Sequence, residues 1–283
     1  MAGMLYLVPT PIGNLGDISK RARETLESAD FIAAEDTRVT LKLLNHLELK
    51  KPLVSYYEHN KSFKGEKILD RILAGETCAL VSDAGSPAIS DPGEDLVKQC
   101  AAAGIPVCAI PGPCAAITAL SISAQSTGRF CFEGFLSTAK KSRREHLDSL
   151  KKEQRTMIFY EAPHKLLNTL QDMAEVFGAD RPISLCRELT KLHEEIWKTT
   201  LGEAVEHYRA AEPRGEYVLV MAGAPAGAAE EEELTLEQAA QRAFALTSEG
   251  FSASAAAKAA AQGTAYSKSE VYKQLLLLQQ AAE

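Results

Sequence analysis

The segment LYLVPTPIGNLGD (Leu5–Asp17) decides how the rest of the chain is interpreted. Residues 4–8 are apolar and predict a buried strand, which is followed by a loop with two prolines and two glycines. This loop is neither a G-x-G-x-x-G dinucleotide fingerprint nor a P-loop with its Gly-Lys-Ser/Thr ending. Two interpretations follow: the loop binds a ligand, or it only turns the chain.

Apolar strands and helical periods alternate through the first half of the chain. Strands are expected at 4–8, 30–33, 78–82 and 105–110, and helices at 19–29, 38–47, 63–74, 93–103 and 113–124. Such alternation predicts βαβ units and a parallel sheet, that is, an α/β domain over residues 1–120. Right-handed crossovers bring the loops at the strand carboxyl ends to one edge, where ligands bind in open α/β sheets.

The pattern changes after residue 120. Strands are expected from RFCFEGFL (129–136) onward at 156–160, 182–186, 194–201 and 216–223, with helices at 141–152, 163–177 and 203–211. Fewer crossover helices predict a mixed sheet in an α+β domain over 121–224. A low-complexity linker is then expected at 225–233. Three helices follow in a small appendage at 234–283, for which a helix-turn-helix is the alternative.

Composition limits the class of protein. The chain has 283 residues, of which 46% are hydrophobic and 24% charged, and its longest apolar runs are too short for a bilayer. No secretory signal is recognised, and six cysteines without a C-x-x-C pair are typical of free thiols in the cytoplasm. The scattered histidines give no support for a metal site.

One basic segment stands out against a net charge of −7. Between residues 137 and 156, seven basic side chains face three acidic ones, beginning with Lys140, Lys141, Arg143 and Arg144. This segment could bind an RNA backbone. The alternative is a solvated amphipathic helix, because Leu147 and Leu150 give it an apolar side.

Two further loops follow strands of the first domain. In LVSDAGSPAISDPG (80–93), Asp83 and Ser86 place a carboxylate and a hydroxyl beside accessible backbone, although Asp83 could simply satisfy local amides. In IPGPCAAITAL (110–120), Ala115 and Ala116 would let a flat ligand lie against the backbone, although tight helix–strand packing explains the alanines almost as well.

Charged clusters also follow strands in both halves. In AAEDTR (33–38), Glu35 or Asp36 could take a proton from a hydroxyl with Arg38 beside it, or Asp36 could cap the following helix. CRELTKLHEE (186–195) supplies Arg187 and Lys191. These clusters all follow strands and are expected to face a cleft between the two domains. Together they predict a binding site more strongly than any one of them does alone.

Seven segments in this order resemble the ribosomal RNA small subunit methyltransferase I family, one of the tetrapyrrole-methylase-like methyltransferases that use S-adenosyl-L-methionine (SAM). They are LYLVPTPIGNLGDIS, IAAEDTR, LVSDAGSPAISDPG, IPGPCAAITAL, RFCFEGFL, FYEAPHKL and CRELTK. The resemblance covers residues 4 to about 223 and extends to the C-terminal helices. Two departures are the polar SISAQSTGRF (121–130) and Tyr57, where the family often has histidine.

The resemblance implies a two-domain fold with SAM between the domains, usually a homodimer. It implies methyl transfer to the 2′-hydroxyl of a cytidine in 16S rRNA near the decoding centre, with the assembled small subunit as substrate. The implied SAM contacts are Pro11, Asp83, Ser86, Ala115, Ala116, Tyr160 and Met221.

The same resemblance assigns roles to the charged clusters. Either Glu35 or Asp36 would be the base, with Arg38 steering a phosphate or the carboxylate, and the two acids are not separated by sequence. The RNA backbone would meet Lys140, Lys141, Arg143, Arg144, Arg187 and Lys191. Two rival functions are C-methylation of a tetrapyrrole on the same fold and a non-catalytic RNA-binding assembly factor.

Overall fold

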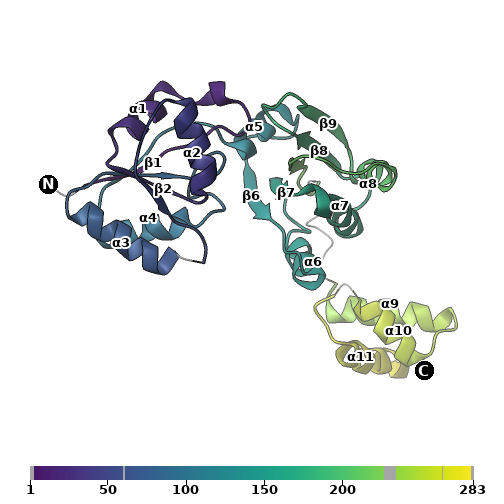
Figure 1. Cartoon of the computed structure of the whole chain (residues 1–283). Helices are drawn as coiled ribbons and strands as arrows, with labels where there is room; N and C mark the ends of the chain where they lie inside the picture. The colour runs from purple at the N-terminus through teal and green to yellow at the C-terminus, as the bar shows by residue number, and fades with distance from the viewer. Residues whose placement is uncertain (1–2, 60, 226–233, 263, 282–283) are drawn as a thin grey trace. The chain divides into compact units, whose positions relative to one another are not determined.

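The first half of the chain folds around a five-stranded sheet in the computed structural model (Figure 1). The structure describes residues 3–59, 61–225, 234–262 and 264–281. The strands are β1 (Leu5–Leu7), β2 (Phe31–Ala34), β3 (Leu53–Ser55), β4 (Cys78–Val81) and β5 (Val107–Ala109). Their order is β3-β2-β4-β1-β5 and every neighbouring pair is parallel, which confirms the expected α/β domain.

Both faces of this sheet are covered, as is usual for parallel strands. The covering helices are α1 (Lys20–Ser28), α2 (Thr37–His46), α3 (Lys61–Leu73) and α4 (Gly93–Ala102), with a short 3-10 helix at Leu15–Asp17. Alternate side chains of β2 enter different cores. Ile32 packs with residues of α1 and α2, whereas Phe31 packs with residues of α3 and α4. Ser19 caps α1 by accepting a hydrogen bond from the Ala22 N–H.

A second sheet of five strands follows. Its strands are β6 (Phe130–Phe135), β7 (Thr156–Glu161), β8 (Pro182–Arg187), β9 (Glu195–Thr200) and β10 (Tyr217–Met221). Their order is β6-β7-β10-β8-β9. Only β6 and β7 pair in parallel, and the other neighbours are antiparallel. The expected mixed sheet is therefore confirmed.

Helix α5 connects the two halves. The helices of this region are α5 (Ala115–Ile122), α6 (Lys140–Ser149), α7 (Pro163–Phe177) and α8 (Leu201–Ala210). Although α5 follows a strand of the first sheet, Ala116, Ala119 and Leu120 pack against β7 and β10 of the second. The opposite face of the second sheet carries the larger core, to which α6, α7 and α8 contribute.

The chain divides into two compact units, Met1–Gly223 with both sheets and Ala224–Glu283 with three helices. The three helices are α9 (Leu236–Ser248), α10 (Ala253–Ala261) and α11 (Lys268–Ala281). Their shared core is rich in alanine, so the helices approach closely. The expected linker at 225–233 lies outside the described residues except for Pro225. None of the described helices is both long and apolar enough to cross a membrane.

Candidate functional site

The three Gly/Pro-rich loops of the first half meet at one edge of the first sheet, because β4, β1 and β5 are neighbours in it. Thr10 and Gly85 exchange backbone hydrogen bonds of 2.9 and 3.0 Å, which join the loop after β1 to the loop after β4. The Ser86 hydroxyl donates to the Pro113 carbonyl at 3.0 Å, which joins the loop after β4 to the loop before α5. The three loops therefore form one continuous wall.

A cavity of about 610 Å³ lies between this wall and the second sheet, a size ordinary for a small-molecule site. The first half lines it with Ile12, Glu35, residues 82–86 and 89–91, Cys114 and Ala115. The second half lines it with Phe135, residues 160–164, Cys186, Leu189, Lys191 and residues 216–218.

Most of the residues expected to contact a cofactor lie at this cavity. Asp83, Ser86, Ala115 and Tyr160 line it directly. The backbone N–H of Ala116 donates to the Tyr160 hydroxyl at 3.1 Å, which ties the first turn of α5 to the end of β7. Burial raises the pKa of Tyr160 to about 12, so this hydroxyl stays protonated at neutral pH.

Three expected contacts, Pro11, Ala116 and Met221, do not line the cavity. In the first loop, Ile12 lines it instead of its neighbour Pro11. Met221 is fully buried in the core beneath α7 and α8. The reason is strand direction: β10 runs antiparallel to β7, so Tyr217 pairs with Glu161 at the cavity end while Met221 pairs with Met157 at the far end. A strand of five residues places these ends ~13 Å apart.

The acid pair after β2 is split by the structure. Glu35 lines the cavity, and its pKa is raised by burial and by the nearby carboxylates of Asp83 and Asp91. Asp36 instead caps α2, where its carboxylate accepts hydrogen bonds from the Arg38 N–H at 2.8 Å and from the Arg38 guanidinium at 2.6 Å. Arg38 lowers the pKa of Asp36 to about 2.

Charge in the cavity is mostly negative. The described lining residues include five carboxylates, those of Glu35, Asp83, Asp91, Glu161 and Glu216, and one lysine, Lys191. Lys191 is itself paired with Glu188 at 2.7 Å and with Glu216 at 2.8 Å. This balance favours a cationic ligand and disfavours a polyphosphate.

The basic side chains expected on RNA differ widely in their surroundings. Arg143 is only 7% exposed, and its guanidinium forms an ion pair with the buried Asp172 at 2.6 Å. Arg144 pairs with Glu175, and Arg187 pairs with Glu195 at 2.9 Å. Lys140 and Lys141 are exposed on α6, where Lys141 has only a loose 3.9 Å contact to Glu145.

Sequence patterns gave no role to several lining residues. Asp91 holds its loop by accepting hydrogen bonds from the Ala88 N–H at 2.9 Å and the Gly93 N–H at 2.7 Å. His164 lies at the start of α7, and Phe135 lies at the end of β6. Phe135 is the last residue of a strand, and His164 follows the end of the next strand by three residues. A position at or just after a strand end is the sequence signal that could have identified both.

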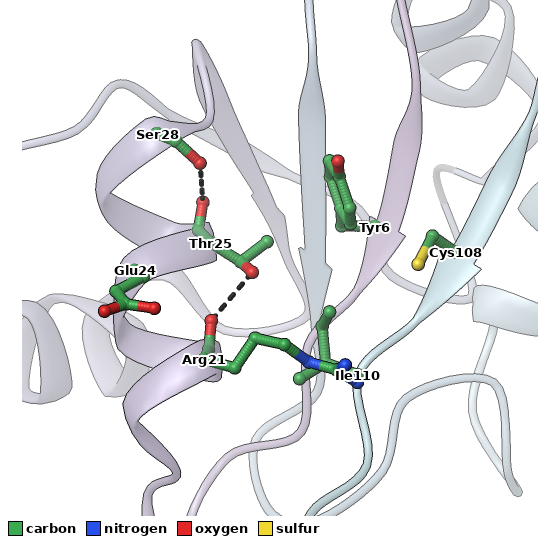
Figure 2. Close-up of a pocket in the computed structure, with 7 residues that line it drawn as sticks. All are labelled: Tyr6, Arg21, Glu24, Thr25, Ser28, Cys108 and Ile110. Atoms are coloured by element: carbon green, nitrogen blue, oxygen red, sulfur yellow. Dashed lines mark hydrogen bonds between the residues drawn. The ribbon is translucent and has the colours of Figure 1, made fainter.

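A second hollow, of about 430 Å³, lies on the α1 side of the first sheet. Figure 2 shows Tyr6 of β1, Cys108 of β5 and Ile110, the residue after β5, on one side of this hollow. Side chains of α1 lie on the other side. The Thr25 and Ser28 hydroxyls donate to carbonyls of their own helix at 2.7 and 3.1 Å. Because those hydroxyls are already engaged and Ile110 is the one described lining residue that follows a strand end, we regard the larger cavity as the candidate site.

Comparison with known proteins gives consistent results. The family "Tetrapyrrole (Corrin/Porphyrin) Methylases" matches residues 4–205. A relative from Synechocystis, called ribosomal RNA small subunit methyltransferase I, is 52% identical over 78% of this chain and 80% of its own length. A relative of the same name from Escherichia coli O157:H7 is 45% identical over 97% of this chain and 95% of its own length.

Solved structures share the fold at low sequence identity. Uroporphyrin-III C-methyltransferase from Thermus thermophilus, in a complex with S-adenosylhomocysteine, superposes with a TM-score of 0.56 at 16% identity. The match covers 78% of this chain and 97% of that one. A diphthine synthase superposes with a TM-score of 0.59 at 11% identity, over 78% of this chain and 90% of that one.

Proposed function

Because the chain belongs to the ribosomal RNA small subunit methyltransferase I family of the tetrapyrrole methylases, we propose that it methylates the 2′-hydroxyl of a cytidine in 16S rRNA. The methyl donor is SAM, and the substrate is the assembled small subunit near its decoding centre. The observation that carries the proposal is the cavity itself, which is lined from both sheets and whose described residues carry more carboxylates than cations.

The cavity fits this donor chemically. SAM supplies an electrophilic methyl on a positively charged sulfonium, together with an ammonium and ribose hydroxyls. The excess of carboxylates suits those positive charges, and Ala84, Gly85 and Ala115 leave backbone groups accessible for polar contacts. We place Asp83 on the ammonium or the ribose hydroxyls, because a carboxylate against the sulfonium would stabilise the charged reactant more than the transition state.

Glu35 is the proposed base. A ribose hydroxyl attacks well only when its proton is at least partly removed, and the removing group must be unprotonated and unengaged. Glu35 lines the cavity, and its raised pKa makes it a better proton acceptor than an ordinary carboxylate. Asp36 is a poor acceptor because Arg38 occupies its carboxylate and lowers its pKa to about 2. We therefore leave Asp36 and Arg38 out of the chemistry.

The RNA backbone is assigned to the exposed lysines of the α6 region. Lys140 and Lys141 lie on the helix, and Lys151 and Lys152 follow it, all four exposed. Exposed lysines bind phosphates without first breaking a buried ion pair. Arg143 is left out because Asp172 engages it. A cytoplasmic location, which the free cysteines support, and a homodimer, which the resemblance implies, complete the proposal.

The test uses small subunits from cells that lack this protein. The purified chain is incubated with them and methyl-labelled SAM, and the modified nucleotide is mapped by mass. Label on one cytidine ribose is the expected result. Binding of SAM with no label in rRNA would favour the tetrapyrrole alternative, and no binding of SAM in calorimetry would favour the assembly factor.

A further inference from the structure

The last residue of β6 is turned toward the cavity by a β-bulge. The pairing of β6 with β7 shifts register between Phe132 and Gly134, so Glu133 is an extra residue in the strand. Gly134 adopts a φ of +64°, a conformation that glycine accepts without steric cost. Without the bulge, Phe132 and Phe135 would point to opposite faces of the sheet, because side chains alternate.

With the bulge, both rings reach the same partner. Phe132 and Phe135 each contact Tyr160 edge to face, with ring centroids 5.0 and 5.4 Å apart. Phe135 lines the cavity, yet it remains 57% exposed. An aromatic ring held in a defined direction and left largely in water is unusual unless a ligand covers it, since burial of such a ring is favourable.

An exposed aliphatic side chain lines the same cavity. Ile89 is 49% exposed. Its neighbours Ala88 and Ser90 have φ values of +67° and +61°, which are strained for residues other than glycine. A Cβ added to Gly134 would come within 3.2 Å of the Ser90 hydroxyl, so the loop carrying Ile89 touches the strand end carrying Phe135.

Phe135 packs against Tyr160, which is one of the proposed SAM contacts. The Tyr160 ring touches Phe135, whereas its hydroxyl is bound to the Ala116 N–H at the start of α5. Phe135 therefore lines the cavity beside a proposed SAM contact. The base attached to the methylated ribose must lie within one sugar ring of the hydroxyl, and proteins hold such unstacked bases on aromatic rings.

We propose that Phe135 and Ile89 hold the base of the target nucleotide, with the base stacked on the Phe135 ring and Ile89 covering its other side. This inference rests on the proposed function. It makes Phe135 a positioning residue for the ribose: a stacked base fixes where its 2′-hydroxyl stands relative to Glu35. Stacking is tolerant of base identity, so Phe135 contributes position more than cytidine selectivity.

The experiment compares Phe135→Ala, Phe135→Leu and Phe135→Tyr on unmethylated small subunits. The matched control is Phe130→Ala, which removes another partly exposed ring from the same strand but away from the cavity. We expect Phe135→Ala to lower kcat/KM roughly 5- to 150-fold, the factor for losing one base–aromatic stack. Phe135→Tyr should stay near wild type, Phe135→Leu should resemble alanine, and the Kd for SAM should not change.

Three results would overturn the inference. One is an unchanged kcat/KM in Phe135→Ala. Another is full activity in Phe135→Leu, which would show that only apolar cover is needed. The third is a loss of SAM affinity that accounts for the loss of activity, which would assign the ring to the cofactor. Wild-type protein that leaves the subunits unmethylated contradicts the proposed function as well, whereas an active wild type with an equally active Phe135→Ala contradicts the inference alone.

Discussion

Three acidic residues that the first half contributes to the cavity differ from two arginines of the second half in how they are paired. Among the described residues, Glu35, Asp83 and Asp91 form no ion pair, and the carboxylates of Asp83 and Asp91 lie close enough to Glu35 to raise its pKa. In the second half, Arg143 and Arg187 are each held by a carboxylate.

This difference separates charges that stabilise the fold from charges available for chemistry. The ion pair with a carboxylate offsets the desolvation cost of a buried arginine and occupies its guanidinium. Such an arginine is therefore poorly placed to bind a substrate. A carboxylate crowded by others without a cation, as Glu35 is, keeps a raised pKa and remains free to bind a positive ligand or accept a proton. Substitutions in each group should therefore change different measurements.

The largest effect is expected for Glu35→Gln. Removing a general base typically costs about 10²–10⁴-fold in rate, so kcat on small subunits should fall by roughly that factor while the Kd for SAM stays the same. The matched control is Asp36→Asn, which removes the charge paired with Arg38 but keeps a side chain that can cap α2, and it should leave kcat within a few fold. If Asp36→Asn reduced activity more than Glu35→Gln did, the assignment of the two acids would be reversed.

Arg143→Ala should have the largest effect on stability. It leaves the buried Asp172 with only a loose 4.0 Å contact to Arg144, and loss of the main partner is expected to cost about 3–5 kcal/mol in the free energy of unfolding measured by urea denaturation. The control is Arg144→Ala, because its partly exposed pair with Glu175 and its 4.0 Å contact to Asp172 are together expected to be worth only about 1 kcal/mol.

A double variant sharpens this prediction. Arg143→Met combined with Asp172→Leu replaces the buried pair by apolar groups and should recover most of the stability that Arg143→Ala removes. Similar stabilities for Arg143→Ala and wild type would show that the pair contributes nothing to the fold. Arg143 would then again be a candidate for contact with the RNA backbone.

A smaller effect is expected when Lys140 and Lys141 are both replaced by alanine. For each phosphate that the variant no longer binds, the slope of log Kd for small subunits against log salt should flatten by roughly 0.7–0.9. The control is Arg187→Ala, because Glu195 already engages that guanidinium. An unchanged slope in the double lysine variant would remove α6 from the RNA interface.

Sequence patterns predicted the order of elements well because they depend on local apolar periodicity. The parallel sheet, the mixed sheet and the loop edge follow from alternation and short apolar runs. Strand direction in the second sheet is a long-range property. The family resemblance implies a cofactor contact at Met221, and nothing local in the sequence indicates that β10 places this residue at the end far from the cavity.

Pairing of charges was the other property that sequence could not supply. Arg143 and Lys140 look alike in the run KKSRR, yet one faces Asp172 from the distant helix α7 and the other faces water. The bulge in β6 was equally hidden, because a single extra residue in a strand changes which face Phe135 occupies without changing the apolar pattern.

The smallest effect concerns stability against pH in Glu35→Gln. The pKa of Glu35 is raised in the folded protein, so the folded state holds this proton more tightly than the unfolded state does. The contribution of Glu35 to the free energy of unfolding is fully present below the ordinary glutamate pKa. It is lost as the pH rises through the pKa that Glu35 has in the folded protein. Glutamine cannot ionise, so the variant should unfold at a higher temperature than wild type at about pH 7.5, and the difference should vanish by about pH 4.

Glu35 is only half-buried, so solvent screening keeps the gain small. Thermal unfolding followed by circular dichroism at both pH values measures the difference in melting temperature between variant and wild type. Asp36→Asn is expected to show a difference of the opposite sign. The lowered pKa of Asp36 predicts a loss of stability in that variant that is present at neutral pH and disappears as pH falls toward about 2. If Glu35→Gln were less stable than wild type at neutral pH, the glutamate would have to be paired with a cation, and the contrast between the two groups of charges would not hold.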